Sequence, residues 1–163
     1  MKHSAEQRLE KADAYLDGWE EQLGLPPLRQ PQSHSEAIKL LDLGPDERKC
    51  LTPEDARDAV LILAQFAAYI SRATQREEAR MIWCQDTIIK TVAARMQQQN
   101  AYSYQERLSL AISENDHATR LEQMRALAQA KWKRLSFHAQ RIEGIKMAYQ
   151  NLANFHRRRD EHG

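Results

Sequence analysis

The chain has 163 residues, 42% of them hydrophobic, and its formal net charge is only +1. This length suits one domain, or one core with appended arms. Five glycines and five prolines, in a sequence rich in Ala, Leu, Gln, Glu and Arg, favour helices and disfavour a compact mixed fold. We therefore predict an all-α protein.

Cellular location is indicated by what the sequence lacks. Cys50 and Cys84 stand 34 residues apart, which fits neither a disulfide framework nor a metal site. The N-terminal sequence has no apolar signal-peptide core, and no run approaches the roughly 20 apolar residues of a membrane span. We expect a soluble, cytoplasmic protein with no membrane partner.

The small net charge hides a gradient along the chain. Residues 1–58 contain 8 basic and 13 acidic residues, a balance of −5. Residues 59–116 contain 6 of each, and residues 117–163 contain 10 basic and 4 acidic residues, a balance of +6. Such asymmetry indicates an anionic partner at one end, or acid-to-base contacts between subunits.

Residues 1–50 are predicted to form an acidic, helical N-terminal arm. Ser4 and Gln7 make a capping box at the start of its first helix. A narrow apolar seam follows at spacings of three and four, and its members are Leu9, Ala12, Leu16, Trp19 and Leu23. Gly24 and the LPP sequence end this helix. A linker rich in Pro, Gln and Ser leads to a short helix over 36–43, which the Gly44-Pro45 pair ends.

Residues 51–163 are predicted to form a long helical hairpin. Thr52 is the expected N-cap of its first helix, with Pro53 at the first helical position. A seam with coiled-coil spacing follows, and it comprises Ala56, Val60, Leu63, Ala67, Ile70, Thr74, Glu77, Met81, Cys84 and Ile88. Thr74 and Glu77 are its weak positions.

The second helix of the hairpin is predicted from about Tyr104 to about Arg158. Ser103 and Glu106 form a capping box at its start, and the polar SENDHATR sequence bends it or marks a partner contact. Its seam comprises Leu108, Ile112, Leu121, Met124, Ala128, Trp132, Leu135, Ala139, Ile142, Ile145, Tyr149 and Leu152. Helices of about 70–80 Å favour an antiparallel hairpin that forms a homo-oligomer.

No pattern in the sequence indicates catalysis. Glu114 and His117 have the Glu-x-x-His spacing of di-iron bundles, but a second such motif is absent, so we predict no metal site and no cofactor. Cys84 lies on the apolar seam, where a buried and inert thiol is expected. The sequence has no nucleophile elbow and no phosphate-binding glycine loop. We predict that the protein is not an enzyme.

The basic end is the one informative feature of the sequence. At 100° per residue, a basic stripe lies beside the seam of the last helix and a cluster lies near its C-terminus. The predicted nucleic-acid-binding residues are Arg120, Lys131, Lys133, Arg134, His138, Arg141, Arg157, Arg158 and Arg159. Phe137 and Phe155 lie off the seam and are candidates for base stacking, whereas Trp132 and Tyr149 belong to the core. A solvated charged face and a protein docking surface remain open as alternatives.

A resemblance to a known protein family rests on three stretches of the sequence. They are EEARMIWCQDTI (77–88), YSYQERLSLAISENDHATRLEQ (102–123) and RLSFHAQRIEGIKMAYQNLANFHRRR (134–159). Their arrangement resembles bacteriophage recombination mediators of the UvsY-like type. The resemblance implies a helical oligomer that binds single-stranded DNA and helps to load a RecA-like recombinase onto DNA covered by single-strand-binding protein. It also implies the host cytoplasm as location. No catalytic residue is implied.

Two functions are therefore predicted as alternatives. The first is a non-enzymatic, single-stranded-DNA-binding accessory protein of phage-type recombination. The second is a helical scaffold or adaptor, as in a virion or secretion assembly, whose basic end docks on an acidic protein partner. The acidic arm either masks the basic face or engages a basic partner.

Overall fold

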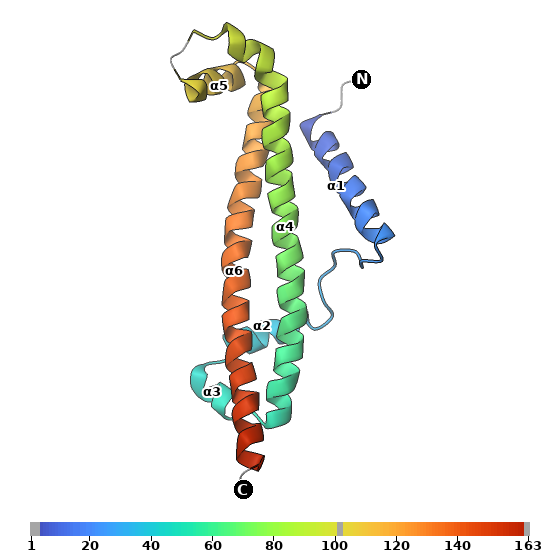
Figure 1. Cartoon of the computed structure of the whole chain (residues 1–163), viewed down its shortest axis with the longest axis vertical. Helices are drawn as coiled ribbons and strands as arrows, with labels where there is room; N and C mark the ends of the chain where they lie inside the picture. The colour runs from blue at the N-terminus through green and yellow to red at the C-terminus, as the bar shows by residue number, and fades with distance from the viewer. Residues whose placement is uncertain (1–3, 101–102, 162–163) are drawn as a thin grey trace. The chain divides into compact units, whose positions relative to one another are not determined.

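The structure, a computed structural model, describes residues 4–100 and 103–161, with side chains as far as Phe155. Within these residues it is built from α-helices and has no strand, which confirms the predicted all-α class. The helices are α1 (Ala5–Gln22), α2 (His34–Asp42), α3 (Pro45–Lys49), α4 (Pro53–Gln98), α5 (Tyr104–Ser113) and α6 (Asp116–Glu161) (Figure 1). The long helices α4 and α6 pack together as the predicted hairpin.

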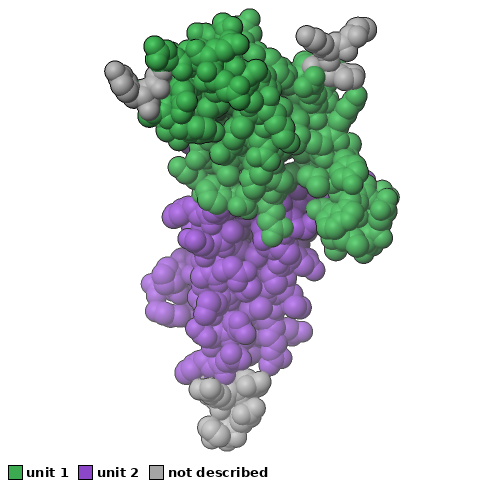
Figure 2. Space-filling view, turned by 45° about the horizontal axis from the view of Figure 1, so that its top comes forward, with its two compact units in different colours: residues 1–27, 75–133 green, residues 28–74, 134–163 purple. Residues whose placement is uncertain are grey.

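The chain divides into two compact units, which Figure 2 shows in different colours. Each unit contains a part of both long helices. Unit 1 comprises residues 1–27 and 75–133, so it includes α1 and α5. Unit 2 comprises residues 28–74 and 134–163, so it includes α2 and α3. Within the predicted arm, the first helix thus belongs to one unit and the following two helices belong to the other.

The core of unit 1 is formed by small and medium-sized side chains from four helices. Cys84, Ile88 and Val92 of α4 are buried with Leu121 of α6. Alanines complete this cluster, and they are Ala5 of α1, Ala111 of α5 and Ala118 of α6. Alanine lets two helices approach closely, which is why short side chains at these positions join α1 and α5 to the hairpin.

The core of unit 2 is larger in side-chain volume and holds α2 and α3. Leu63 and Phe66 of α4 are buried with Ile142 and Tyr149 of α6. The Tyr149 hydroxyl donates a hydrogen bond of 2.8 Å to the main-chain carbonyl of Leu40, at the C-terminal end of α2. The Arg48 guanidinium of α3 lies 5.5 Å from the centre of the same ring. One aromatic side chain therefore ties both short helices to α6.

The predicted helix starts are confirmed in their hydrogen bonds. Ser4 and Ser103 each accept a bond from the third helical residue, and the side chains of Gln7 and Glu106 bond back to them. The Asp55 amide donates a 3.1 Å bond to the Thr52 hydroxyl. These caps satisfy main-chain amides that have no partner within the helix.

The prediction of one continuous helix from Tyr104 to Arg158 is wrong. The helix ends at Ser113 and a new helix begins at Asp116, with Glu114 and Asn115 between them. The Asn115 side chain accepts a 3.0 Å bond from the Ala118 amide, which caps α6. An asparagine at this position stabilises a helix start better than a helix interior, so the polar SENDHATR sequence divides the predicted helix.

The start of the chain differs from prediction in two further ways. The seam of α1 is half-buried only at Leu9 and Ala12, because Leu16, Trp19 and Leu23 are 40%, 53% and 59% exposed. A helix, α3, also begins at Pro45, where the sequence indicated only a break. Proline fits the first position of a helix, and the Glu47 carboxylate accepts a 2.6 Å bond from the Gly44 amide.

Candidate nucleic-acid interface

The basic residues of α6 in unit 2 share one exposed face. Arg134, His138 and Arg141 are exposed and follow one another at spacings of four and three residues. Ile142 is only 3% exposed and Leu135 is half-buried. The apolar face of α6 is therefore turned to the core, and the basic face is not. Among the residues with described side chains, Arg134 and Arg141 have no carboxylate partner. Two guanidinium groups on this face are therefore available to an external anion.

The predicted basic residues of α6 in unit 1 fall into two kinds. Lys131 and Lys133 are exposed, and neither forms an ion pair within the described part of the chain. Arg120 is bound by α1, because its Nε donates to the Glu6 carboxylate. Its Nη1 donates a 3.1 Å bond to Gln123 of α6 itself. The Arg120 contact also lowers the pKa of Glu6 below its ordinary value. Arg120 is thus occupied while α1 stays in place.

The aromatic residues of the basic end divide as the sequence predicts. Trp132 is half-buried and Tyr149 is buried. Phe137 and Phe155 are 64% and 61% exposed. The Phe137 ring meets the His138 ring edge-on, with 5.9 Å between centroids. An exposed ring beside a basic face can stack on a nucleotide base. The predicted cluster of Arg157, Arg158 and Arg159 lies outside the residues whose side chains are described.

A second set of arginines was not among the predicted site residues. Arg80 of α4 forms hydrogen bonds of 3.0 Å and 2.7 Å with one oxygen of Asp13 on α1, and Arg76 lies 2.8 Å from Asp17. Glu77, a weak position of the predicted seam, is only 8% exposed and also binds Arg80. The hydrogen bond that Arg80 donates to Asp13 is the main reason that the pKa of Arg80 is raised. The sequence offered one indication of these ion pairs, which is that Asp13 and Asp17 are four residues apart, as are Arg76 and Arg80.

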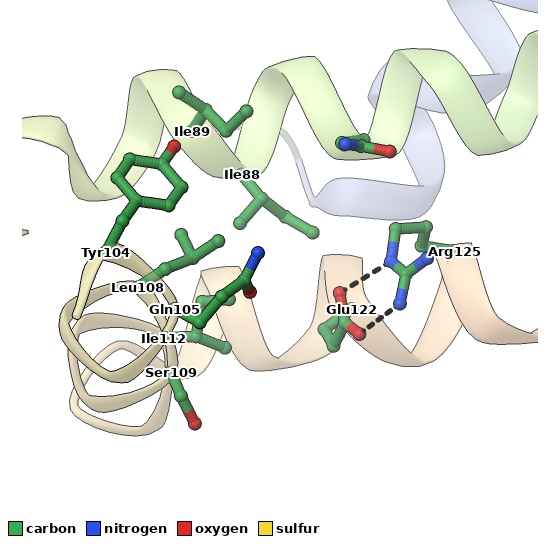
Figure 3. A pocket seen from close by; sticks show the side chains of 10 residues that line it. Ile88, Ile89, Tyr104, Gln105, Leu108, Ser109, Ile112, Glu122 and Arg125 are labelled. Atoms are coloured by element: carbon green, nitrogen blue, oxygen red, sulfur yellow. Dashed lines mark hydrogen bonds and ion pairs between the residues drawn. The ribbon is translucent and has the colours of Figure 1, made fainter.

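Unit 1 also contains an open pocket of about 410 Å³ between α4, α5 and α6. Figure 3 shows Tyr104 at one end of it and a doubly hydrogen-bonded Glu122–Arg125 pair at the other, with Ile88 between them. The two bonds measure 2.8 Å and 2.6 Å, so each side chain neutralises the other. The two charged side chains of this pocket are therefore paired with each other.

The remaining candidates for chemistry are Cys84, Glu114 and His117, and the first two are buried or paired. Cys84 is fully buried, and loss of solvation raises the pKa of its thiol to about 11. Glu114 accepts bonds from Arg95 and Gln99, and the Arg95 contact lowers its pKa. His117, predicted to be no metal ligand, is half-buried. Among the residues that the structure describes, no three His, Cys, Asp or Glu side chains are grouped so as to hold a metal ion.

Comparison with known protein families, with curated proteins and with solved structures finds nothing that matches this chain. Within the described ranges, none of the helices combines the length and the apolar character needed to cross a membrane.

Proposed function

We propose that this protein is a non-enzymatic accessory protein that binds single-stranded DNA through the basic face of α6. The observation that carries the proposal is the exposure of Arg134, His138 and Arg141 on one face of α6. The neighbouring face of this helix is packed into the core of unit 2, which fixes the orientation of the basic face. A fixed row of cations neutralises successive phosphates without reading base sequence. Phe137 adds an exposed ring on which a base can stack.

The charge of the neighbouring sequence supports this choice over a plain solvated face. From Lys131 to Phe155, Glu143 is the single acid, and its carboxylate is 2.6 Å from the Lys146 ammonium. The other basic groups of this segment keep their charge uncompensated by close partners within the described side chains. An ordinary solvated helix face mixes charges of both signs, which this face does not.

The resemblance to phage recombination mediators leads us to propose the biological setting. The protein would hold single-stranded DNA and assist the loading of a RecA-like recombinase in the presence of a single-strand-binding protein. Exposed apolar side chains on the long helices support a homo-oligomer, and they include Leu61, Ile82, Leu127 and Met147. In an oligomer, several weak basic faces would act on one strand by avidity.

The proposal is tested by changing the α6 face in the full chain. We expect Arg134→Ala/Arg141→Ala to weaken binding of a fluorescent oligodeoxythymidylate at about 50 mM salt by tenfold or more, because two phosphate contacts are lost. Lys39→Ala/Lys90→Ala is the matched control, because both lysines are exposed on other helices and carry the same total charge. Equal weakening by both variants would show that only net charge matters, and would overturn the proposed face.

The alternative function is an adaptor that docks on an acidic protein. A protein partner is favoured by the exposed apolar side chains of α1, of which Tyr15 is 76% and Trp19 is 53% exposed, in addition to the basic end that would dock on it. Interfaces between proteins are enriched in such aromatic side chains. If the wild-type protein fails to bind the oligonucleotide at low salt, the adaptor function replaces the first proposal.

A further inference from the structure

Three arginines of unit 1 form ion pairs with carboxylate side chains of the same chain. Arg76 and Arg80 of α4 and Arg120 of α6 each contact a carboxylate of α1. The Arg80 contact uses Nε and Nη2, which is the planar fork that guanidinium groups also present to phosphate. The arginines are thus oriented for oxyanions, and α1 supplies the oxyanions.

The carboxylates that fill these positions form a row. Glu6, Asp13 and Asp17 are seven and four residues apart, so they fall within about 20° of one line along α1. At 1.5 Å per residue, they are spaced by about 10 Å and about 6 Å along the helix axis. A row of single negative charges along one line resembles the phosphate row of a DNA strand at a wider spacing.

The two outer ion pairs of α1 are exposed enough for competition, whereas the central Arg80–Asp13 pair is more buried, with side chains 25% and 14% exposed. Ala5 is its one fully buried side chain in the described structure, and the apolar groups of its second half are exposed. The Arg120–Glu6 pair is exposed on both sides, at 57% and 42%. Exposed ion pairs contribute about 0–1 kcal/mol each and are screened by salt. A polyanion therefore competes first with the exposed pairs, and a phosphate that accepts the same two bonds from Arg80 takes the place of Asp13.

We infer that Arg76, Arg80 and Arg120 form a second binding site for the phosphates of single-stranded DNA, which α1 covers in the absence of DNA. Displacement of α1 releases Arg76 and Arg120 from their carboxylates. Arg80 keeps its Nη1 contact with Glu77 and presents Nε and Nη2 to the strand. The inference rests on the proposed function for the identity of the ligand, but it concerns different residues.

Neutral substitutions on α1 test this site in the full chain. Glu6→Gln/Asp13→Asn/Asp17→Asn removes the competing charges and leaves the arginines in place. We expect its plot of log affinity for oligodeoxythymidylate against log salt to be steeper than that of the wild type by about 2, because three phosphates add about 0.7 each. Glu10→Gln/Glu21→Gln/Glu78→Gln removes the same charge from exposed positions of unit 1 that form no ion pair among the described residues. This control should keep the wild-type slope.

Hydrogen exchange on the wild-type protein provides an independent measurement. A released α1 of 18 residues is only marginally helical in water, so its amides should exchange faster when the oligonucleotide is added. Unchanged or slower exchange in α1 at saturating oligonucleotide would overturn the inference, whatever the behaviour of the variants.

The outcomes separate this inference from the proposed function. If the wild type binds through Arg134 and Arg141 but the α1 variant keeps the slope of its control, the second site is disproved and the first stands. If Arg134→Ala/Arg141→Ala binds the oligonucleotide as the wild type does and the α1 variant shows the steeper slope, the first site is disproved and the second stands. If the α1 variant gains affinity for polyglutamate and not for the oligonucleotide, the site takes an acidic polypeptide and the inference is overturned.

Discussion

Tyr149 shows how a single side chain organises unit 2. Its ring is 1% exposed, its hydroxyl donates to the Leu40 carbonyl, and the Arg48 guanidinium lies over its ring. Burial raises the pKa of the phenol, so the hydroxyl keeps its proton for this bond at neutral pH. Three segments of the chain therefore depend on one residue of α6.

We expect Tyr149→Phe to lower the free energy of unfolding by about 1 kcal/mol, because the Leu40 carbonyl loses its donor while the ring still fills the core. Urea denaturation of the two proteins measures this difference. Tyr15→Phe is the matched control, since Tyr15 is 76% exposed and its change should have no effect. Equal stability of Tyr149→Phe and the wild type would contradict the role assigned to the hydroxyl.

The two cysteines differ in the reactivity that their surroundings allow. Cys84 is fully buried and its thiol has a pKa of about 11, whereas Cys50 is exposed. At about pH 8, an aromatic disulfide reagent should modify one thiol per chain quickly and the other only after unfolding. Cys50→Ser should abolish the fast phase, and rapid modification of both thiols in the native protein would contradict the burial of Cys84.

Periodicity alone located the contact faces of the two long helices. The predicted seam positions of α4, from Ala56 to Ile88, are all buried or half-buried, and Glu77 is tolerated among them because Arg80 pairs with it. Tyr149 was correctly assigned to the core for the same reason. Such positions are predictable because a helix turns through a fixed angle at every residue, and a long apolar stripe can pack in few ways.

Features that depend on tertiary contacts could not be predicted in this way. The seam of α1 continues through Leu16 and Trp19, but these side chains are exposed because the ion pairs at Asp13 and Asp17 fix the docked face. The interruption at Asn115 depends on competition between two helix caps and one continuous helix. Spacing does not indicate which of these interactions is stronger.

The contact between α1 and α6 makes a pH-dependent prediction. The hydrogen bond from Arg120 is the main cause of the lowered pKa of Glu6, so the pair stabilises the docked α1 above pH 4.5. This stabilisation is lost as the pH falls through the lowered pKa. The carboxyl resonance of Glu6 should therefore titrate below 4.5 in an NMR experiment, and Arg120→Ala should return it toward 4.5.

Arg95→Ala is the control for this titration. Arg95 lowers the pKa of Glu114 in the same manner, so its removal should raise the midpoint of Glu114 and leave that of Glu6 unchanged. An unshifted Glu6 in the Arg120→Ala protein would show that α1 is not held at this position.

At the scale of the whole molecule, the charge gradient of the sequence located the basic end, but it did not show which of the basic residues are already ion-paired. Arg134 and Arg141 are exposed as predicted residues of an interface should be, whereas Arg120 is bound to Glu6. Acids and bases that lie far apart in the chain meet only after folding, so net charge per segment cannot show which cations are already neutralised. The described ion pairs supply that information and distinguish the basic face of α6 from the arginines beneath α1.

The central claim, binding of single-stranded DNA by the basic face of α6, is tested most directly by the salt dependence of the wild-type affinity. Fluorescence anisotropy of a labelled oligodeoxythymidylate would be measured at several salt concentrations from about 50 to 200 mM. Neutralisation of about four phosphates predicts a straight line of log affinity against log salt with a slope near −3. No binding at the lowest salt, or an affinity that does not change with salt, would contradict it.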